Sequence, residues 1–264
     1  MSDQPRHVVY YQTSAGFVAV GQTDVGKIRQ ANEDSLLIIP EPPALPDIQI
    51  IAVVADGMGG HVGGAIASST AVEALDRYIC CLSQSDNLPN SLGETLEQAI
   101  KDANQAIQFE ATAKGLLGMG TTITAAMVGM TSAVIANVGD SRAYLLRNGS
   151  LDQITEDHSL VWEQVRKGLL PKEALETHPQ RNILTRALGI APVAVVDIFP
   201  VELESGDVIL LCSDGLYPVV AHEDIRTALT TRTAQDACDH LIVTANAHGG
   251  PDNITVMIIQ VPLD

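Results

Sequence analysis

The sequence predicts an α+β fold: a sandwich of two antiparallel β-sheets whose outer faces are covered by α-helices, giving four layers. The first observation is about ten short apolar runs rich in β-branched residues, which are typical of buried strands. These runs lie on both sides of a pair of amphipathic helical segments, an order that favours two packed sheets. Third, Asn148-Gly149 between two of the runs is a strong signal for a two-residue hairpin, so neighbouring strands are predicted to be antiparallel.

Size and composition fit one domain that can bury a full core. The chain has 264 residues, of which 46% are hydrophobic and 18% are charged, values typical of a globular protein. Its formal net charge of −17 argues against sequence-independent binding to nucleic acid or to an anionic membrane surface. We see no internal repeat or inter-domain linker, and we expect a monomer.

Cysteine usage and hydropathy predict a cytoplasmic location. The chain has neither a Cys-x-x-Cys pair nor disulfide-like spacing, which fits a reducing compartment. The N-terminus lacks the apolar core of a signal peptide. Gly129 and Asn137 interrupt the most apolar long window, residues 123–138, so two strands joined by a turn explain it better than a membrane span. The four cysteines are Cys80, Cys81, Cys212 and Cys238.

The N-terminal half begins with strands. Residues 1–16 are predicted to be a polar tail, and short strands are expected at 17–23 and 36–39. A proline-rich loop then precedes residues 48–55, where seven of eight residues are apolar and a buried strand is expected.

Two helices follow, and then the strands resume. Small and apolar residues recur at helical spacing over 61–82. A second helix is expected from Ser91, which forms a capping box with Glu94, to about residue 113. Strands then fill the region around 123–138 and both sides of the Asn-Gly turn.

Residues 156–190 have no clear sheet pattern. They are polar and helical in patches, as expected of an insertion that lies over a site, and we name them the flap. After it we expect strands at 196–203 and 207–212, helices at 221–231 and 233–248, and a last strand after residue 252.

Four aspartates stand at the ends of buried runs: Asp56, Asp140, Asp214 and Asp252. A single aspartate in such a place is usually a turn residue or a helix cap. Four of them predict one carboxylate cluster at one edge of the sheets. Oxygen ligands select hard divalent cations, so we expect Mn²⁺ or Mg²⁺. Such ions also explain how several carboxylates stay ionised in one place.

A further charged group lies in residues 26–35, just before a strand. Glu33 and Asp34 are adjacent, and Arg29 precedes them in a predicted turn. A surface charge pair is the simpler interpretation. Beside the four aspartates, phosphate recognition by Arg29 with metal support from Glu33 and Asp34 explains the pattern better.

Seven motifs in order resemble the metal-dependent protein serine/threonine phosphatases, the PPM or type 2C family, and its short stand-alone bacterial branch above all. They are RQANEDS, VVADGMGGH, GMGTT, NVGDSRAYL, ILTRALG, LLCSDGL and GGPDNITV. The resemblance covers about residues 17–262, which would be one catalytic domain running to residue 264. It implies the same sandwich, a site at one of its ends, and hydrolysis of phosphoserine and phosphothreonine in proteins.

The resemblance implies a set of metal ligands. Asp56, Asp214 and Asp252 would hold one Mn²⁺ or Mg²⁺, and Asp56 with the backbone carbonyl of Gly57 would hold the other. Asp140 with Asp214 matches a third, weaker site found in bacterial members. Two ions that share a water lower its pKa toward neutrality, so the implied reaction is in-line attack on phosphorus without a phosphoenzyme.

Other residues would serve the metals or the substrate. Glu33 and Asp34 would place metal-bound waters, and Arg29 would orient the phosphate oxygens. Animal members place a histidine directly after the Asp-Gly pair as a proposed general acid. Here residues 58–60 intervene, so the leaving alkoxide takes its proton from a metal-bound water or from His61.

The flap is the best candidate for selecting phosphoprotein substrates, because phosphate and metals are common to all phosphomonoesters. His178 and Arg181 lie within it. The alternative is that the segment only caps a sheet edge. We expect the partners to be proteins phosphorylated by serine/threonine kinases.

Two other functions stay open at this point. One is a non-catalytic relative that binds phosphoproteins; such decoys typically lack an acidic residue or the arginine, all of which are present here. The other is a two-metal hydrolase of nucleotides or phosphodiesters.

Overall fold

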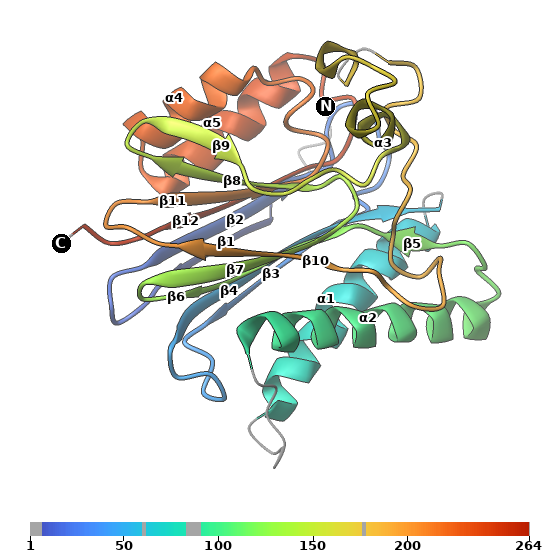
Figure 1. The fold of residues 1–264 in the computed structure, drawn as a ribbon, viewed down its shortest axis with the longest axis horizontal. Coiled ribbons are helices and arrows are strands. Elements are labelled where there is room, and N and C mark those ends of the chain that lie inside the picture. The colour runs from blue at the N-terminus through green and yellow to red at the C-terminus, as the bar shows by residue number, and fades with distance from the viewer. Residues whose placement is uncertain (1–6, 60–61, 83–90, 176–177, 264) are drawn as a thin grey trace.

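The computed structural model describes residues 7–59, 62–82, 91–175 and 178–263, and it confirms the predicted sandwich of two antiparallel sheets with helices outside (Figure 1). The first six-stranded sheet, sheet A, has the order β1-β2-β12-β11-β8-β9. Its strands are β1 (His7–Gln12), β2 (Val18–Asp24), β12 (Ile254–Gln260), β11 (Val208–Cys212), β8 (Arg142–Arg147) and β9 (Ser150–Gln153).

Sheet B packs face to face with sheet A. It has the order β10-β7-β6-β4-β3, and the two-residue β5 pairs with β4. Its strands are β10 (Asp197–Glu202), β7 (Ser132–Val138), β6 (Ile123–Gly129), β4 (Ile48–Met58), β3 (Asp34–Pro40) and β5 (Gly120–Thr121).

Helices cover both outer faces (Figure 1). Sheet B carries α1 (Val62–Leu82) and α2 (Leu92–Lys114), and sheet A carries α4 (His222–Thr231) and α5 (Ala234–Ala247). The short α3 (Leu160–Arg166) and a 3₁₀ turn (Lys172–Ala174) lie in the flap. None of the described helices is long and apolar enough to cross a membrane.

Three apolar clusters hold the layers together. Ile50 of sheet B and Ile209 and Met257 of sheet A are fully buried between the sheets. Leu75 and Ile100 pack the α1–α2 layer on sheet B, while α4 and α5 are packed on sheet A in the same way. Because both faces of each sheet are covered, all seven residues of β6 are buried. Burial of each of its larger apolar side chains, those of Ile123, Met127 and Val128, contributes about 1.5–3 kcal/mol.

The local signals of the sequence are confirmed. Ser91 caps α2 by accepting from the Glu94 N–H at 3.2 Å. Asn148 (φ 50°) and Gly149 (φ 79°) both adopt positive φ, as a type I′ hairpin between β8 and β9 requires. Met130 and Thr131 separate β6 from β7, so the apolar window there is a pair of strands.

Two expectations were wrong. The predicted tail contains β1, which pairs with β2 along its whole length and so supplies the edge of sheet A. Its side chains are mostly exposed on both faces, so no burial pattern marks it in the sequence. One of the helical patches expected in the flap covers residues 171–178, and in the described part of that patch the structure has only the 3₁₀ turn Lys172–Ala174.

Candidate metal and phosphate site

The topology brings the predicted carboxylates to one end of the sandwich. Asp56 lies near the C-terminal end of strand β4, opposite Asp34 of β3 in the antiparallel register. Asp214 follows β11, whose last residue pairs with the first residue of β8, and Asp140 precedes β8. Asp252 precedes β12, whose partner is also β11. Strands from both sheets therefore deliver acids to the same edge.

Asp34 is a carboxyl in a buried setting. Its Oδ2 accepts from Ser213 Oγ at 2.8 Å and from Thr255 Oγ1 at 2.6 Å. Its Oδ1 is buried and, among the described residues, has no hydrogen-bond partner. Burial raises the pKa of Asp34 to about 7 despite the two hydroxyl donors, and the charges of Asp214 and Asp252 add to this.

Burial and the charges of neighbouring acids also raise the pKa values of the other acids. Burial, with the charges of Asp34, Asp214 and Asp140, holds the pKa of Asp56 well above its usual range. Asp140 is shifted in the same direction by burial and by Asp214. Burial and Asp252 raise the pKa of Asp214 to about 6, although a hydrogen bond from Asp56 opposes this shift. The group therefore favours protons or cations over free negative charge.

This donor set fits hard divalent cations. Its side-chain donors are all carboxylate oxygens, and the unpartnered Asp34 Oδ1 leaves a buried lone pair for an ion or its water. Among the described residues, no three acidic, histidine or cysteine side chains already form a closed ligand set. Two of the acids instead accept hydrogen bonds from other side chains: Asp34 from hydroxyl groups and Asp252 from Arg29.

Arg29 reaches this end from the loop before β3. Its Nη2 donates to Asp252 Oδ2 at 2.6 Å, and this hydrogen bond raises the pKa of Arg29. The two side chains are 44% and 28% exposed, so the guanidinium is open to an incoming anion. The loop and the Asp252 turn thus place one positive group beside the acids.

Asn253 joins these two loops, and it was not singled out in the sequence. Its Nδ2 donates to the carbonyls of Val25 and Ala31 at 2.9 and 3.0 Å, and its Oδ1 accepts from the Glu33 N–H at 2.9 Å. Gly26, with φ +78°, passes so close to the Asp252 carbonyl that a Cβ would clash. Main-chain contacts between the two loops therefore hold Arg29 and Asp252 close together.

Glu33 and Gly57 lie together beside the start of α1. The Gly57 N–H donates to the Glu33 carbonyl at 3.2 Å. A Cβ on Gly64 would collide with Glu33 Oε2 and lie 2.8 Å from the Gly57 carbonyl oxygen. The glycine at position 64 thus makes room for both oxygens that the sequence assigned to the metals.

Hydroxyls link Asp56 to Asp140. Thr122 Oγ1 accepts from the Asp56 N–H at 3.0 Å and shares a 2.8 Å hydrogen bond with Ser141 Oγ. These residues, like Ser213 and Thr255, were missed by the sequence analysis. The signal that could have found them is a polar residue inside or next to an apolar strand, where burial requires a partner.

The flap residues differ in placement. Arg181 lines a small cavity with Asp140 and Asp214, and its charge lowers the pKa of Asp214. His178 accepts the Gln180 N–H at 3.2 Å within the flap. Its role in substrate selection stays a prediction. His61, the other histidine named from the sequence, lies outside the described residues.

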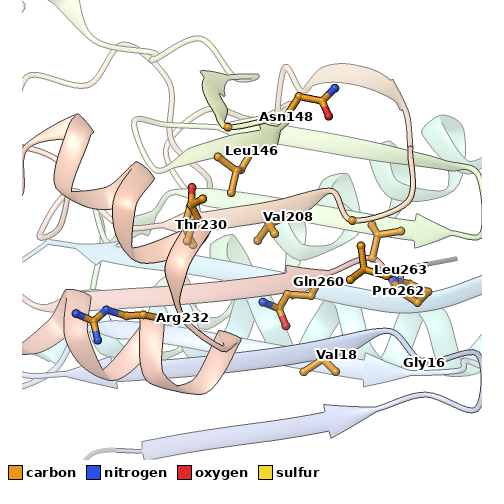
Figure 2. Close-up of a pocket in the computed structure, with 14 residues that line it drawn as sticks. Gly16, Val18, Leu146, Asn148, Val208, Thr230, Arg232, Gln260, Pro262 and Leu263 are labelled. Carbon is orange, nitrogen blue, oxygen red and sulfur yellow. The ribbon is translucent and has the colours of Figure 1, made fainter.

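Two larger cavities flank sheet A. One of about 870 Å³ adjoins the site between the flap and α4, and Arg142 and Tyr217 are shared with the small cavity. The other, of about 530 Å³, lies at the far end, where β2 and β11 begin and β8 and β12 end (Figure 2).

Comparison with known proteins places this arrangement in a family. Residues 5–248 match the sequence profile of the family described as protein phosphatase 2C. The serine/threonine phosphatase stp of Listeria monocytogenes is 41% identical over 243 residues, covering 90% of this chain and 94% of that protein. The serine/threonine protein phosphatase PstP of Mycobacterium tuberculosis is 36% identical over 91% of this chain and 44% of its own length.

Solved structures show the same fold. The Mycobacterium tuberculosis PstP/Ppp structure superposes with a TM-score of 0.82 at 34% identity, covering 93% of this chain and 99% of that one. Stp1 from Staphylococcus aureus gives 0.84 at 34% identity, with 98% and 99% covered. A PstP catalytic domain in complex with two manganese ions gives 0.80 at 33% identity, with 94% and 99% covered.

Proposed function

Because this chain belongs to the protein phosphatase 2C family, we propose that the carboxylate end of its sandwich is the active site of the phosphatase and that the acids there hold Mn²⁺ or Mg²⁺. The chain is a metal-dependent protein serine/threonine phosphatase. The observation that carries the site assignment is the convergence of four strand-end aspartates whose shared negative charge needs a counter-charge.

The proposed roles of the ligands are those that the family resemblance implies. Asp56, Asp214 and Asp252 would hold one ion, Asp56 and the Gly57 carbonyl the second, and Asp140 with Asp214 a third. Asp34 and Glu33 would place metal-bound waters; the buried, unpartnered Asp34 Oδ1 and the closeness of Glu33 to Gly57 support this. Bound ions supply a water acidified toward neutral pKa and positive charge for the phosphate.

Arg29 would bind the phosphate. Its guanidinium is partly exposed and, among the described residues, is held by one charge-assisted contact to Asp252, so its other N–H groups can bind two phosphate oxygens. Holding the ester there aligns phosphorus for in-line attack, and the arginine offsets charge on the equatorial oxygens in a loose transition state. No side-chain nucleophile is needed, so no phosphoenzyme is expected.

The proton for the leaving alkoxide would come from a water at the acids or from His61.

The decisive experiment compares substrates. With Mn²⁺ present, we expect inorganic phosphate to be released from a phosphothreonine peptide and a dinucleotide to stay intact. Turnover of the dinucleotide instead would favour a phosphodiesterase, and tight peptide binding without phosphate release would mean a non-catalytic relative. Asp214→Asn is the control, since any contaminating phosphatase would survive in its preparation.

Partners and location complete the proposal. The substrates would be proteins phosphorylated by serine/threonine kinases of a bacterial cell, and the enzyme would act in the cytoplasm as a monomer. All four cysteines are free thiols, as a reducing compartment requires.

A further inference from the structure

Tyr217 contacts the main chain of one proposed metal ligand. It lies in the turn after β11, and its hydroxyl donates to the Asp140 carbonyl at 3.1 Å. This hydrogen bond holds the peptide between Asp140 and Ser141, and so the backbone from which the Asp140 side chain extends.

The Tyr217 ring is itself held by a buried ion pair. The Arg142 guanidinium stacks over it, 3.5 Å from the ring centroid. Arg142 Nε and Nη2 donate to the Asp157 carboxylate at 2.9 and 2.7 Å, and the two side chains are 16% and 9% exposed. A cation–π contact that is shielded from water in this way is strong enough to hold the Tyr217 ring in place. Asp157 lies at the base of the flap, so the flap supports the tyrosine through Arg142.

The residue before Asp140 is held from the other side. The His158 N–H donates to the Gly139 carbonyl at 2.8 Å, and His158 Nδ1 accepts the Gly139 N–H at 3.0 Å. Gly139 has φ +115°, and a Cβ there would clash with Thr122. His158 thus holds the carbonyl of the peptide before Asp140, and Tyr217 holds the carbonyl of the peptide after it.

We propose that Tyr217 is a positioning residue for Asp140 and tightens the binding of the cation that Asp140 shares with Asp214. The inference rests on the proposed function, because it takes Asp140 as a ligand. Tyr217 touches neither substrate nor cation in this proposal; it acts through the main chain of Asp140.

The test compares Tyr217→Phe with Tyr144→Phe. Tyr144 is a matched control, because it is a neighbouring tyrosine that also contacts Arg142, whose Nη1 donates to its hydroxyl at 3.1 Å. Mn²⁺ binding is followed by electron paramagnetic resonance of the free ion. For Tyr217→Phe we expect the weakest Mn²⁺ to bind about fivefold more weakly, the worth of a neutral hydrogen bond, with the tighter ions unchanged. Unchanged binding, or an equal loss in Tyr144→Phe, would overturn the proposal.

An Asp140→Asn background separates this inference from the proposed function. There, Tyr217→Phe should cause no further loss of Mn²⁺ affinity; a further fivefold loss would mean that Tyr217 acts elsewhere. If Asp140→Asn alone left Mn²⁺ binding intact, both the assignment of Asp140 and this inference would fall, while turnover of the phosphopeptide would still support the phosphatase. Should Tyr217→Phe not fold, Asp157→Asn, which weakens the support of Arg142, should lower the same affinity about twofold, and no change would count against the proposal.

Discussion

The two ends of sheet A are built from the same strands but carry opposite chemistry. At the site end, Asp140, Asp214 and Asp252 adjoin β8, β11 and β12, and burial with mutual repulsion raises the pKa of the first two. At the far end, the apolar Leu146 and Val208 line a cavity that polar side chains such as Gln260 also line (Figure 2). Apolar burial stabilises the far end, whereas the buried and mutually repelling acids destabilise the site end, and in our proposal bound cations relieve that cost. The comparison indicates that the protein keeps these acids for their proposed function although they lower its free energy of unfolding.

The largest expected effect is at the site end. Asp214→Asn should lower turnover of a phosphopeptide by more than the 10–100-fold typical of losing an outer partner of a metal site, because Asp214 would serve two ions. Asp140→Asn should lower the rate mainly at limiting metal. Phosphate release at saturating Mn²⁺ measures both, and near-normal activity of Asp214→Asn would refute the two-metal assignment.

Removing divalent ions should next distinguish the two ends by stability. Ions that bind only the native state add about 2.7 kcal/mol at a hundredfold excess over Kd, which raises Tm by several degrees. Leu229→Ala at the far end, where the side chain is 4% exposed, should cost about 2–5 kcal/mol with or without metal. Thermal scans in chelator and in Mn²⁺ test this. A metal effect that disappears in Leu229→Ala would show that the ends are not independent.

The size of the metal effect should grow with pH. The folded, metal-free protein holds protons on Asp214 up to about pH 6 and on Asp34 up to about pH 7, whereas the unfolded chain releases them near the usual value of 3.8. Its stability therefore falls as pH rises from about 4 to 7, and metal binding must displace fewer protons at the top of that range. The Tm difference between Mn²⁺ and chelator should increase from pH 5 to pH 7. His158, whose pKa is lowered by burial, contributes equally to both samples and cancels.

The smallest effect concerns the flap. Arg181→Ala should lower kcat/KM for a phosphoprotein about tenfold and for para-nitrophenyl phosphate much less, because only the larger substrate reaches the flap. His178→Ala should act in the same direction. The kcat/KM ratio for the two substrates is the measurement. Equal losses on both would mean that these residues support the acids, as the influence of Arg181 on the pKa of Asp214 allows.

The sequence by itself determined the elements and the acids. Apolar runs, the Ser91 cap and the Asn148-Gly149 turn are local signals, since each depends on neighbours within a few residues. The aspartates could be predicted for the same reason, because each adjoins an apolar run and its position at a strand end is local. The strand β1 could not be identified in this way, because its side chains are mostly exposed and only pairing with β2 defines it.

Only the tertiary structure decided how the acids are held and charged. Asn253 contacts backbone groups more than two hundred residues away, and Tyr217, after β11, contacts Asp140, which lies 77 residues earlier in the chain just before the neighbouring strand β8. The pKa of Asp34 is set by burial and by Asp214, 180 positions along the chain. Such interactions depend on distance in space and on the exclusion of water, and neither has a period or a spacing that a sequence can display.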